Sequence, residues 1–550
     1  MKVTPKRITP SPKPSKYVDF TTAADAYDVI KIFNSGYSEG GASLKRRNLR
    51  SMIPNSGSPT ADILENAQIM RQRSRMLYDC AAVATSAIKT ARTNVIGSGL
   101  VPKPTVNADR LGWTDRQAAE FERLVYDEFA LWADDSFACD ILHMNNFYEM
   151  QSLAFMSMLL SGDVFVLLDR DKRTFNHPYT LRLRLIEADR VRTPALGSYD
   201  CLTVTGTAKN GNRIYDGVEV DDKGRVIAYY IADNYPNEYD FNSRKDNQKD
   251  GPQGSFKRVR ARGRLTGLPN ILQLYQPERP DQYRGVPYLA NVIEELLQLR
   301  RYTEGELSAA VIQSFWTAFI RTEGDPTLIP FNEVTSDDDP EGGLSHNENE
   351  YELGPATINV LRPGESIESI QPTHPQTGFD VFVGALCDQI GAALEIPSDL
   401  LLKRFGASYS ASRAELLEAW KMFRASRQWF VNDFCRPIYR TWFIEAVALG
   451  RIQAPGFMDD PLIQSAYLGC EWVGPAPGQL DPIKEANAAA INLGLGLTTH
   501  EIEAARYNGS TFADNIKKLK TECALLAEAT APLAPQDISQ TEGDQDDTEE

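Results

Sequence analysis

Residues 400–420 read LLLKRFGASYSASRAELLEAW. Two basic residues and an aromatic, Lys403 to Phe405, precede a run of glycine, alanine and serine, and a strongly helical pattern follows. Small residues of this kind are typical of a loop that changes conformation or is approached closely. Ser412 and Glu415 have the spacing of a capping box, so the pattern predicts a helix that begins at Ser412.

The predicted helix continues to about residue 449. It carries an apolar face at helical spacing, made of Leu416, Trp420, Phe423, Phe430 and Phe434. Aromatic residues in such a row can stack on bases, but this spacing favours a packed core or a subunit seam. Pro437 predicts a kink or a division of the helix, because proline lacks the amide proton and its ring collides with the preceding turn.

Upstream of the loop, two long helical patterns flank a polar insert. The patterns cover 286–320 and 379–395, and the insert between them contains DDDPEGG at 337–343. Helical blocks are also predicted at 62–95, 114–132 and 146–160. Between these and the paired helices, segments such as DVFVLLDR and GVEVDDKGRVIAYYIAD indicate strands, with Asp222 to Gly224 at a hairpin turn. A last helical part lies at 482–529, and the whole predicts a mainly helical α+β chain of several structural units.

Charge is distributed unevenly along the chain. The net charge of the 550 residues is −17, yet residues 1–50 contain ten Lys/Arg and four acids. Residues 242–264 contain eight bases and two acids, which fits either a solvated connector or a nucleic-acid contact, whereas 536–550 contain seven acids and no base. An acidic total argues against a protein that grips phosphate with its whole surface. The start of the chain lacks the apolar run of a secretory signal, and no window is apolar enough for a membrane span.

No enzyme signature is present. The sequence lacks a P-loop, a GxSxG elbow and HExxH, and its five histidines are scattered. The seven cysteines lie far apart without a CxxC pair, which favours synthesis in a reducing compartment. Acid runs such as Asp337 to Asp339 are more typical of solvated loops than of metal sites. We therefore expect no catalytic residue, no metal and no cofactor.

Several strings, spread from about residue 60 to 510, resemble the lambda-type family of tailed-phage portal proteins. They are NVIGSGLVPKP, LIEADRVRTP, NRIYDGVEVDDKGRVIAYYI, YQPERPDQYRGVPYLANVI, SYSASRAELLEAW and DPIKEANAAAINLGLGLTTHEIEAARY. None is catalytic, but their order is that of the family. The resemblance implies a portal fold with wing, stem, clip and crown, assembled as a ring of twelve subunits around a central channel for double-stranded DNA.

The resemblance also implies a division of the chain. The expected parts are a mobile basic arm at 1–60, an α+β wing at 61–285, stem helices at 286–321 and 375–399 around a clip at 322–374, a channel loop at 400–411, a long wing helix with its connection at 412–480, a helical crown at 481–530 and a disordered acidic tail at 531–550.

Two sets of site residues follow from these positions. The DNA-facing channel loop would be Lys403, Arg404, Phe405, Gly406, Ala407, Ser408, Tyr409 and Ser410. The partner-binding acids of the clip would be Asp337, Asp338, Asp339 and Glu341. Lys403 and Arg404 could touch phosphates transiently, or they could pair with acids of a neighbouring subunit.

The implied partners are further copies of the chain, DNA, the terminase large subunit, head-completion or adaptor proteins, and the major capsid and scaffold proteins. The protein would be made in the host cytoplasm and reside at the capsid portal vertex, away from any membrane. Twelve copies would carry a charge of about −204. Two other functions stay open: a metal-dependent DNA-processing enzyme of the virion, and a scaffold or membrane-surface protein supported by the basic arm alone.

Overall fold

The computed structural model describes residues 57–194, 205–236, 256–314, 318–322, 365–369, 378–404, 409–477, 482–508 and 512–530. The chain divides into two units, Met1–Gly57 and Ser58–Glu550, and the elements below belong to the second. Almost all of the predicted arm, most of the predicted clip and the whole predicted tail lie outside the described residues.

The described part opens with two helices. In α1 (Pro59–Cys80), Ser58 is the N-cap and its Oγ accepts a hydrogen bond from the Ala61 amide at 3.1 Å. After Ala81, whose backbone is extended, α2 (Ala82–Val95) begins. The single helical block predicted over 62–95 is therefore two helices, divided at Ala81. The sequence has no Gly or Pro at this point that would have predicted the break.

Four further helices precede the first long strand: α3 (Ala108–Leu111), α4 (Asp115–Ala133), α5 (Ser136–Cys139) and α6 (Phe147–Ser161). The helices predicted at 114–132 and 146–160 are confirmed. Both α4 and α6 begin with a complete capping box, made by Thr114 with Gln117 and by Asn146 with Glu149.

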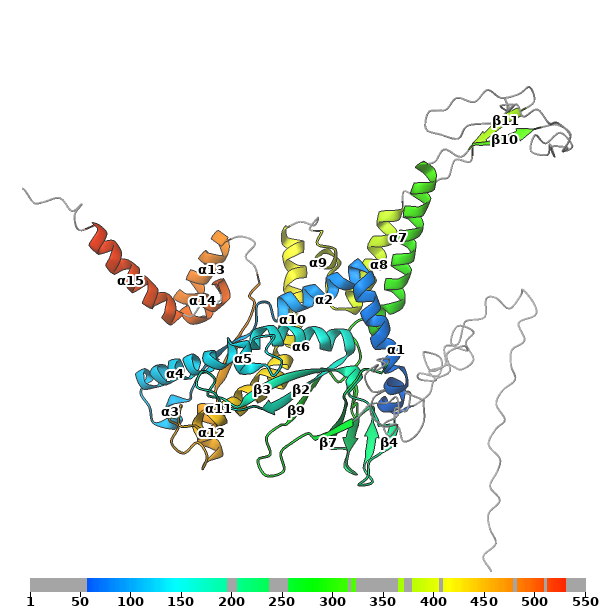
Figure 1. The fold of residues 1–550 in the computed structure, drawn as a ribbon. Coiled ribbons are helices and arrows are strands. Elements are labelled where there is room, and N and C mark those ends of the chain that lie inside the picture. Colours follow the sequence, from blue (N-terminus) through cyan, green and yellow to red (C-terminus); the bar gives the residue numbers. More distant parts are fainter. Residues whose placement is uncertain are drawn as a thin grey trace, which may run out of the picture. The chain divides into compact units, whose positions relative to one another are not determined.

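Two antiparallel sheets follow. The three-stranded sheet has the order β3 (Leu181–Glu187), β2 (Asp163–Arg170), β9 (Ile271–Tyr275). The five-stranded sheet runs in order β4 (Thr205–Thr207), β5 (Arg213–Tyr215), β6 (Val218–Val220), β7 (Val226–Ala232), β8 (Phe256–Arg260). The hairpin predicted at Asp222 to Gly224 joins β6 to β7, and Gly224 has the positive φ (77°) that such a turn requires. A short 3-10 helix, η2 (Ala188–Arg190), ends β3, and α6 packs against β2 and β3 (Figure 1).

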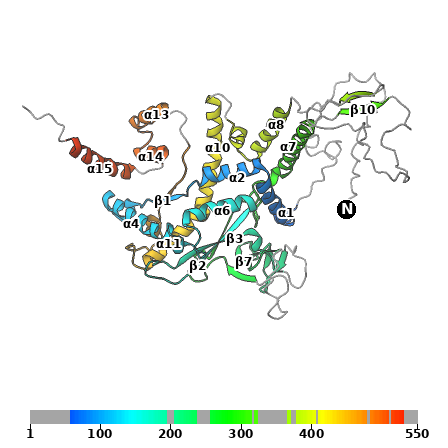
Figure 2. The same cartoon turned by 45° about the horizontal axis from the view of Figure 1, so that its top comes forward.

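The long paired helices are next in the chain. A 3-10 turn, η4 (Ala290–Val292), leads into α7 (Ile293–Ser314), and α8 (Phe379–Ala393) packs beside it (Figure 2). The helix predicted at 379–395 is thus confirmed by α8. The helix predicted at 286–320 is confirmed only in its middle part, because α7 begins at Ile293 and residues 318–320 belong to a strand. Between them the structure describes β10 (Ala318–Thr322) paired antiparallel with β11 (Glu365–Ser369).

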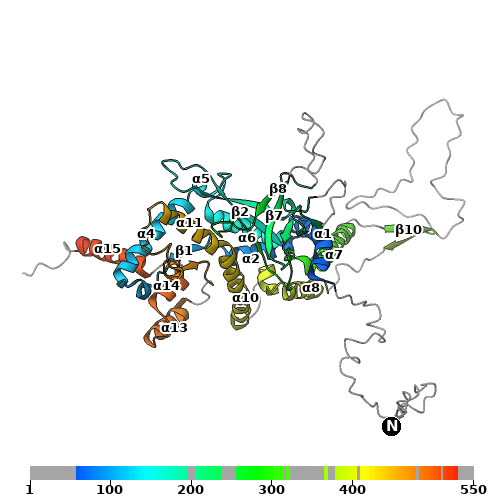
Figure 3. The same cartoon turned by 90° about the horizontal axis from the view of Figure 1, so that it is seen from below.

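A short helix, α9 (Ser398–Leu402), separates α8 from α10 (Tyr409–Phe430). Since α10 begins at Tyr409, Ser412 lies inside its first turn and the predicted capping box at Ser412 is wrong. The division expected at Pro437 is confirmed, because a π-helical segment, η6 (Val431–Cys435), joins α10 to α11 (Arg436–Ala448). Figure 3 labels the two helices that it joins. The wider π turn accommodates the amide-free proline at the start of α11.

The remaining elements are α12 (Pro461–Tyr467), β12 (Cys470–Val473), α13 (Pro482–Gly494), α14 (His500–Asn508) and α15 (Phe512–Thr530). Strand β12 pairs with β1 (Val101–Pro104), so residues far apart in sequence meet in a two-stranded sheet.

The larger core is rich in aromatic side chains from α4, α6 and the α10–α11 run. Phe129 lies 4.9 Å from Trp442 in an edge-to-face contact, and Phe147 stacks on Phe434 at 5.6 Å. Trp420, Phe423 and Phe430 are buried as well. The apolar face predicted for this helix therefore packs in the core, where aromatic pairs add to the gain from burial.

Candidate functional site

The helix pair α7–α8 leaves apolar side chains uncovered toward the end of α7 and the start of α8. Tyr302 of α7 stacks on Phe379 and meets Phe382 edge to face, at ring distances of 5.6 and 4.9 Å. Beyond this contact, Leu307 is 67% exposed and Val381 is 76% exposed. Large apolar side chains exposed on both members of one helix pair are typical of a surface that packs on another protein.

The same pair is acidic. Along α8 the sequence contains Asp380 and Asp388 and no basic residue, and both side chains are exposed. Helix α7 begins with Glu294 and Glu295 and contains two more glutamates against two arginines. The pair thus combines exposed apolar and exposed acidic positions.

A tight turn ends α8. The Ile396 amide donates to Gly391 O at 2.9 Å, and the Glu395 amide donates to Ala392 O at 3.4 Å, with Glu395 in the left-handed region (φ 54°). This is the Schellman arrangement, here with glutamate where glycine is usual, and Pro397 follows it. The Tyr288 hydroxyl donates to Leu394 O, so the root of α7 is fastened to the end of α8.

The predicted channel loop is divided by the structure. Lys403, in the left-handed region (φ 55°), and Arg404 end α9 as exposed residues, with both backbone amides bonded to Asp399 O. Tyr409 and Ser410 are the first two residues of α10. Phe405, Gly406, Ala407 and Ser408 lie outside the described residues. Ser86 of α2 donates to Leu401 O at 2.6 Å, which ties α9, and with it Lys403 and Arg404, to the first helices.

The predicted acids of the clip, Asp337, Asp338, Asp339 and Glu341, also lie outside the described residues. Within the ranges that the structure describes, no three His, Cys, Asp or Glu side chains are grouped as a metal site would need. The helices described there include none that is long and apolar enough to cross a membrane.

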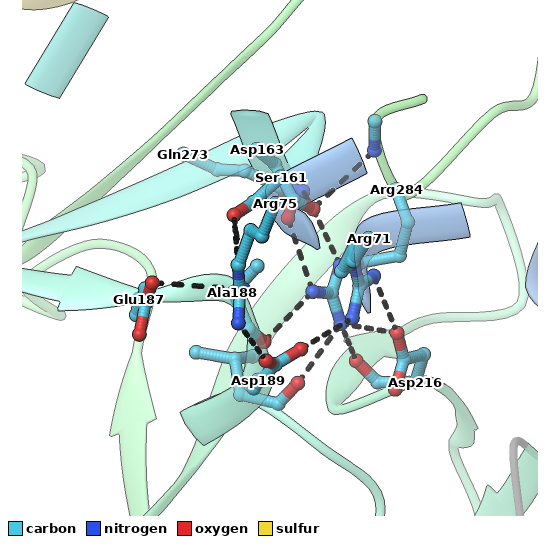
Figure 4. A network of polar contacts seen from close by, with 12 residues as sticks. Arg71, Arg75, Ser161, Asp163, Glu187, Ala188, Asp189, Asp216, Gln273 and Arg284 are labelled. Atoms are coloured by element: carbon cyan, nitrogen blue, oxygen red, sulfur yellow. Dashed lines mark hydrogen bonds and ion pairs between the residues drawn. The ribbon is translucent and has the colours of Figure 1, made fainter. Parts of the chain in front are cut away.

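A buried ionic network lies at the root of α7, and Figure 4 shows its members. Arg284 is fully buried and holds both oxygens of Asp163 on β2, with Nε–Oδ2 at 2.5 Å and Nη2–Oδ1 at 3.1 Å. Its Nη1 donates to Asp216 Oδ2 at 2.6 Å. Two carbonyl oxygens, of Ala188 and Val191, take further hydrogen bonds at 3.0 and 2.9 Å. A planar guanidinium suits such a set of acceptors, which an ammonium could not match.

Two arginines of α1 extend the network. Arg71, itself buried, pairs with Asp216 at 3.0 Å and with Asp189 at 3.6 Å. Arg75 pairs with Asp189 at 2.6 Å and donates to Ser161 Oγ at 3.0 Å (Figure 4). The network therefore joins α1, α6, β2, η2 and the turn before β6 to the segment that enters α7.

The charged forms are mutually stabilised. Burial alone would raise the pKa of the Asp163 carboxyl, but Arg284 and Arg71 outweigh it and the pKa lies below its usual range. Burial alone would lower the pKa of Arg284, but Asp163 and Asp216 raise it. Both partners are ionised at neutral pH, so a change that removes one leaves a buried charge uncompensated.

A glycine pair makes the close approach possible. A Cβ on Gly285 would lie 1.9 Å from Gly162 O, and Gly162 itself has a φ of 86°. Near by, the Tyr288 amide donates to Leu159 O at 2.9 Å. The backbone before α7 thus lies directly against the end of α6, with no room for a side chain at Gly285.

Reasoning from the sequence missed this network. The string DQYRGVPYL contains Arg284 and Gly285, but Asp163 and Asp216 are 121 and 68 residues away. No local pattern links an arginine to partners at such separations. The available signal was the Arg284-Gly285 pair within a string that resembles a known family.

Comparison with known proteins adds an independent finding. A family model described as phage portal protein, lambda family, matches residues 45–427. Portal protein B of Escherichia phage lambda is 23% identical over 490 residues, which cover 86% of each chain. The portal protein of Escherichia phage N15 is 22% identical and covers 86% of this chain and 87% of its own. A probable portal protein of Halomonas phage phiHAP-1 is 24% identical over 80% of this chain and 77% of its own.

Among solved structures, the neck of a native GTA particle computed with C12 symmetry contains a similar chain. The TM-score is 0.37 at 13% identity, over 82% of this chain and 94% of that chain. A chain in the virion of a native gene transfer agent particle gives a TM-score of 0.38 at 14% identity, over 82% and 92%.

Proposed function

The chain belongs to the lambda family of phage portal proteins, and we propose that its copies close into a ring around a channel for double-stranded DNA. The family match over 45–427 carries this proposal. The chain is accordingly a structural head–tail connector of a tailed phage, and its relatives are portal proteins rather than enzymes.

The helix pair α7–α8 supports the ring. One copy alone leaves Leu307 and Val381 exposed, and packing on the pair of the next copy would remove these apolar side chains from water. Asp380 lies about 100° around α8 from Val381, because it is one residue away, and it would then remain on the side that faces the axis. Asp388 is seven residues after Val381 and shares its face of the helix. In a closed ring the contact is heterologous, so each copy uses two different faces. We propose twelve copies, as the family resemblance implies.

The acidic composition suits a conduit. Each fixed contact between a phosphate and a Lys or Arg adds affinity through counterion release, and strong contacts would hold the DNA in place. The chain has 75 acidic residues against 58 Lys and Arg, so on average it repels a phosphate backbone. DNA would therefore slide past an acidic wall, and Lys403 and Arg404 of the channel loop 403–410 would make transient phosphate contacts.

The division into parts remains a proposal with the boundaries expected above. The wing at 61–285 would meet major capsid and scaffold proteins, and α13–α15 would form the crown at 481–530. The clip at 322–374, with Asp337, Asp338, Asp339 and Glu341, would dock the terminase large subunit during packaging and adaptor proteins afterwards. The ATP-driven work would belong to terminase, because this sequence lacks a P-loop. Synthesis would take place in the host cytoplasm, and the assembled ring would occupy the capsid portal vertex.

The test is to image the purified protein in negative stain and to incubate it with duplex DNA and Mg²⁺. The proposal requires rings with an axial hole and intact DNA. Metal-dependent cleavage by protein that forms no ring would replace the conduit with a DNA-processing enzyme.

A further inference from the structure

A strongly basic surface lies on β8 and the residues that follow it. Lys257, Arg258, Arg260, Arg262 and Arg264 all fall within eight positions, and all five residues are exposed. No acidic residue occurs between Phe256 and Pro277. The portal function proposed above gives this cluster, here called the basic edge, no role.

One member of the cluster is structural. Arg258 binds Glu219 through Nε at 2.6 Å and Nη2 at 2.9 Å, and the glutamate is fully buried. Among the residues that the structure describes, Lys257, Arg260 and Arg264 form no ion pair, while Arg262 donates to Gly267 O at 3.3 Å. Like charges this close repel, so a polyanion that bound here would relieve the repulsion.

The cluster lies at the edge of a sheet. β8 pairs with β7 on one side, and the five-stranded sheet ends with it. At the last residue of β8, the Arg260 carbonyl already accepts a hydrogen bond from the Asn270 side chain at 3.1 Å. Extended backbone at a sheet edge can accept a further extended segment through main-chain hydrogen bonds. An acidic peptide could bind both the main chain of β8 and its Lys and Arg side chains, whereas duplex DNA could bind only those side chains.

The same chain contains a segment of the opposite charge. Residues 536–550, QDISQTEGDQDDTEE, contain seven acids, no base and no proline. We propose that the basic edge binds the acidic segment 536–550 of a neighbouring copy in the ring. Exposed Leu265 beside Arg264 offers an apolar contact that Ile538 of the segment could take.

The choice of a neighbouring copy depends on the proposed ring. In a closed ring the segment 536–550 of each copy is tethered next to a neighbouring copy, and tethering raises the effective concentration of the segment at the binding surface. Bound in this way, the segment would neutralise the basic edge. DNA would then not be held there by phosphate contacts, which a conduit must avoid.

A peptide titration tests the contact itself. Fluorescein-labelled peptide 536–550 is added to protein that ends at residue 535, and anisotropy is recorded. We expect saturable binding that weakens at least about tenfold in the triple variant Lys257→Gln, Arg260→Gln, Arg264→Gln, and likewise from about 50 mM to about 500 mM salt. A peptide with its acids replaced by Asn and Gln is the matched control and should not bind. Arg258 is not substituted, because its loss would leave the buried Glu219 carboxylate without its ion partner.

Three results would overturn the contact. The first is no binding of the acidic peptide, in which case the charges serve only to keep the edge strand from pairing with other strands. The second is binding that the triple variant leaves unchanged. The third is a duplex DNA probe that binds the basic edge equally well with and without residues 536–550.

A cross-linking experiment tests the neighbour. Full-length copies grown in ¹⁴N and ¹⁵N media are mixed before assembly and treated with a zero-length carbodiimide, which joins Lys257 to carboxylates. Links between Lys257 and 536–550 in mixed-isotope pairs support the neighbouring copy, and links within one isotope alone contradict it. Negative stain of the same sample separates the two proposals. Rings without such links refute only the contact, whereas peptide binding without rings refutes only the portal arrangement.

Discussion

Arg284 and Asp163 form a fully buried bidentate ion pair, with Nε–Oδ2 at 2.5 Å and Nη2–Oδ1 at 3.1 Å. Asp163 is the first residue of β2, and Arg284 lies nine residues before α7. The pair therefore fixes the entry of the long helix pair to the sheet, and Arg71 and Arg75 connect both to α1.

Removal of Arg284 should be strongly destabilising. Arg284→Met leaves Asp163 as a buried charge without its partner, and the expected loss in unfolding free energy is about 3–5 kcal/mol. Arg284→Lys should restore only part of the lost unfolding free energy, because an ammonium group cannot bind two carboxylates and two carbonyl oxygens at once. Urea unfolding followed by tryptophan fluorescence measures the loss.

Arg116→Gln is the control for this substitution. Arg116 pairs with Glu120 at 3.0 Å on the exposed face of α4, and surface pairs contribute little. Its unfolding midpoint should stay close to that of the wild type. An equally small effect of Arg284→Met would show that the network does not hold the fold together.

Gly285→Ala tests the backbone contact with Gly162. The new methyl group would lie 1.9 Å from Gly162 O, so the segment before α7 must move away from α6. We expect a loss of about 1–3 kcal/mol or more, as in other overpacked sites. Gly305→Ala, inside α7 with open space around it, should instead gain about 0.5–1 kcal/mol. Equal effects of the two substitutions on the urea midpoint would contradict the contact.

Glu219 should make stability depend on acid pH. Burial alone would raise the pKa of its carboxyl, but hydrogen bonds from Arg258, Asn210 and Asn212 lower it to about 2. In the unfolded chain a glutamate titrates near about 4.3. The stabilisation is thus complete above the unfolded pKa and is lost as the pH falls toward 2.

The measurement compares wild type with Glu219→Gln by urea unfolding at a series of pH values. The variant should be less stable at pH 7, and the difference should shrink as the pH falls below about 4.5. Asp222→Asn, at an exposed turn of the same sheet, is the control and should differ little from wild type throughout. A Glu219→Gln difference that stays constant down to about pH 3 would contradict the lowered pKa of Glu219.

Local signals in the sequence predicted local structure well. The helices α4 and α6 start where their capping residues stand, and the Asp222 to Gly224 turn joins two strands. The apolar row from Trp420 to Phe434 also packs in the core, since the helical period alone sets which residues share a face.

Other features depend on contacts that no local pattern contains. Ala81 divides α1 from α2 although alanine is the best helix former, and the helix predicted from Ser412 starts at Tyr409. The short helix α9 placed Lys403 and Arg404 at a helix end rather than in an open loop. Asp163, Asp216 and Arg284 come together only through the tertiary fold, so the sequence could not reveal the network.

Lys403→Ala and Arg404→Ala test the channel loop. Both side chains are exposed at the end of α9, so neither loss should disturb the fold of the subunit. If the loop faces DNA, packaging or retention of DNA changes while rings still form. If rings fail to assemble, the two bases pair with acids of a neighbouring subunit instead. In vitro packaging and negative stain, applied to the same preparations, separate these outcomes.

Charge reversal on α8 tests the acidic wall. Asp380→Lys would offer phosphates a fixed positive charge, and counterion release would make DNA bind where we propose that it slides. Packaging in vitro should slow or stall, more so at low salt. Asp109→Lys, at an exposed position of α3, is the control and should leave the rate unchanged. Normal packaging by the Asp380→Lys variant would show that Asp380 does not face the DNA.

The most direct test of the proposed ring is electron microscopy of the purified full-length protein, with class averages computed without imposed symmetry. We expect closed rings with an axial hole wide enough for a DNA duplex, in which the copies contact one another through the α7–α8 pair. Monomers only, or assemblies without an axial hole, under conditions in which the subunit is folded, would contradict the proposed ring.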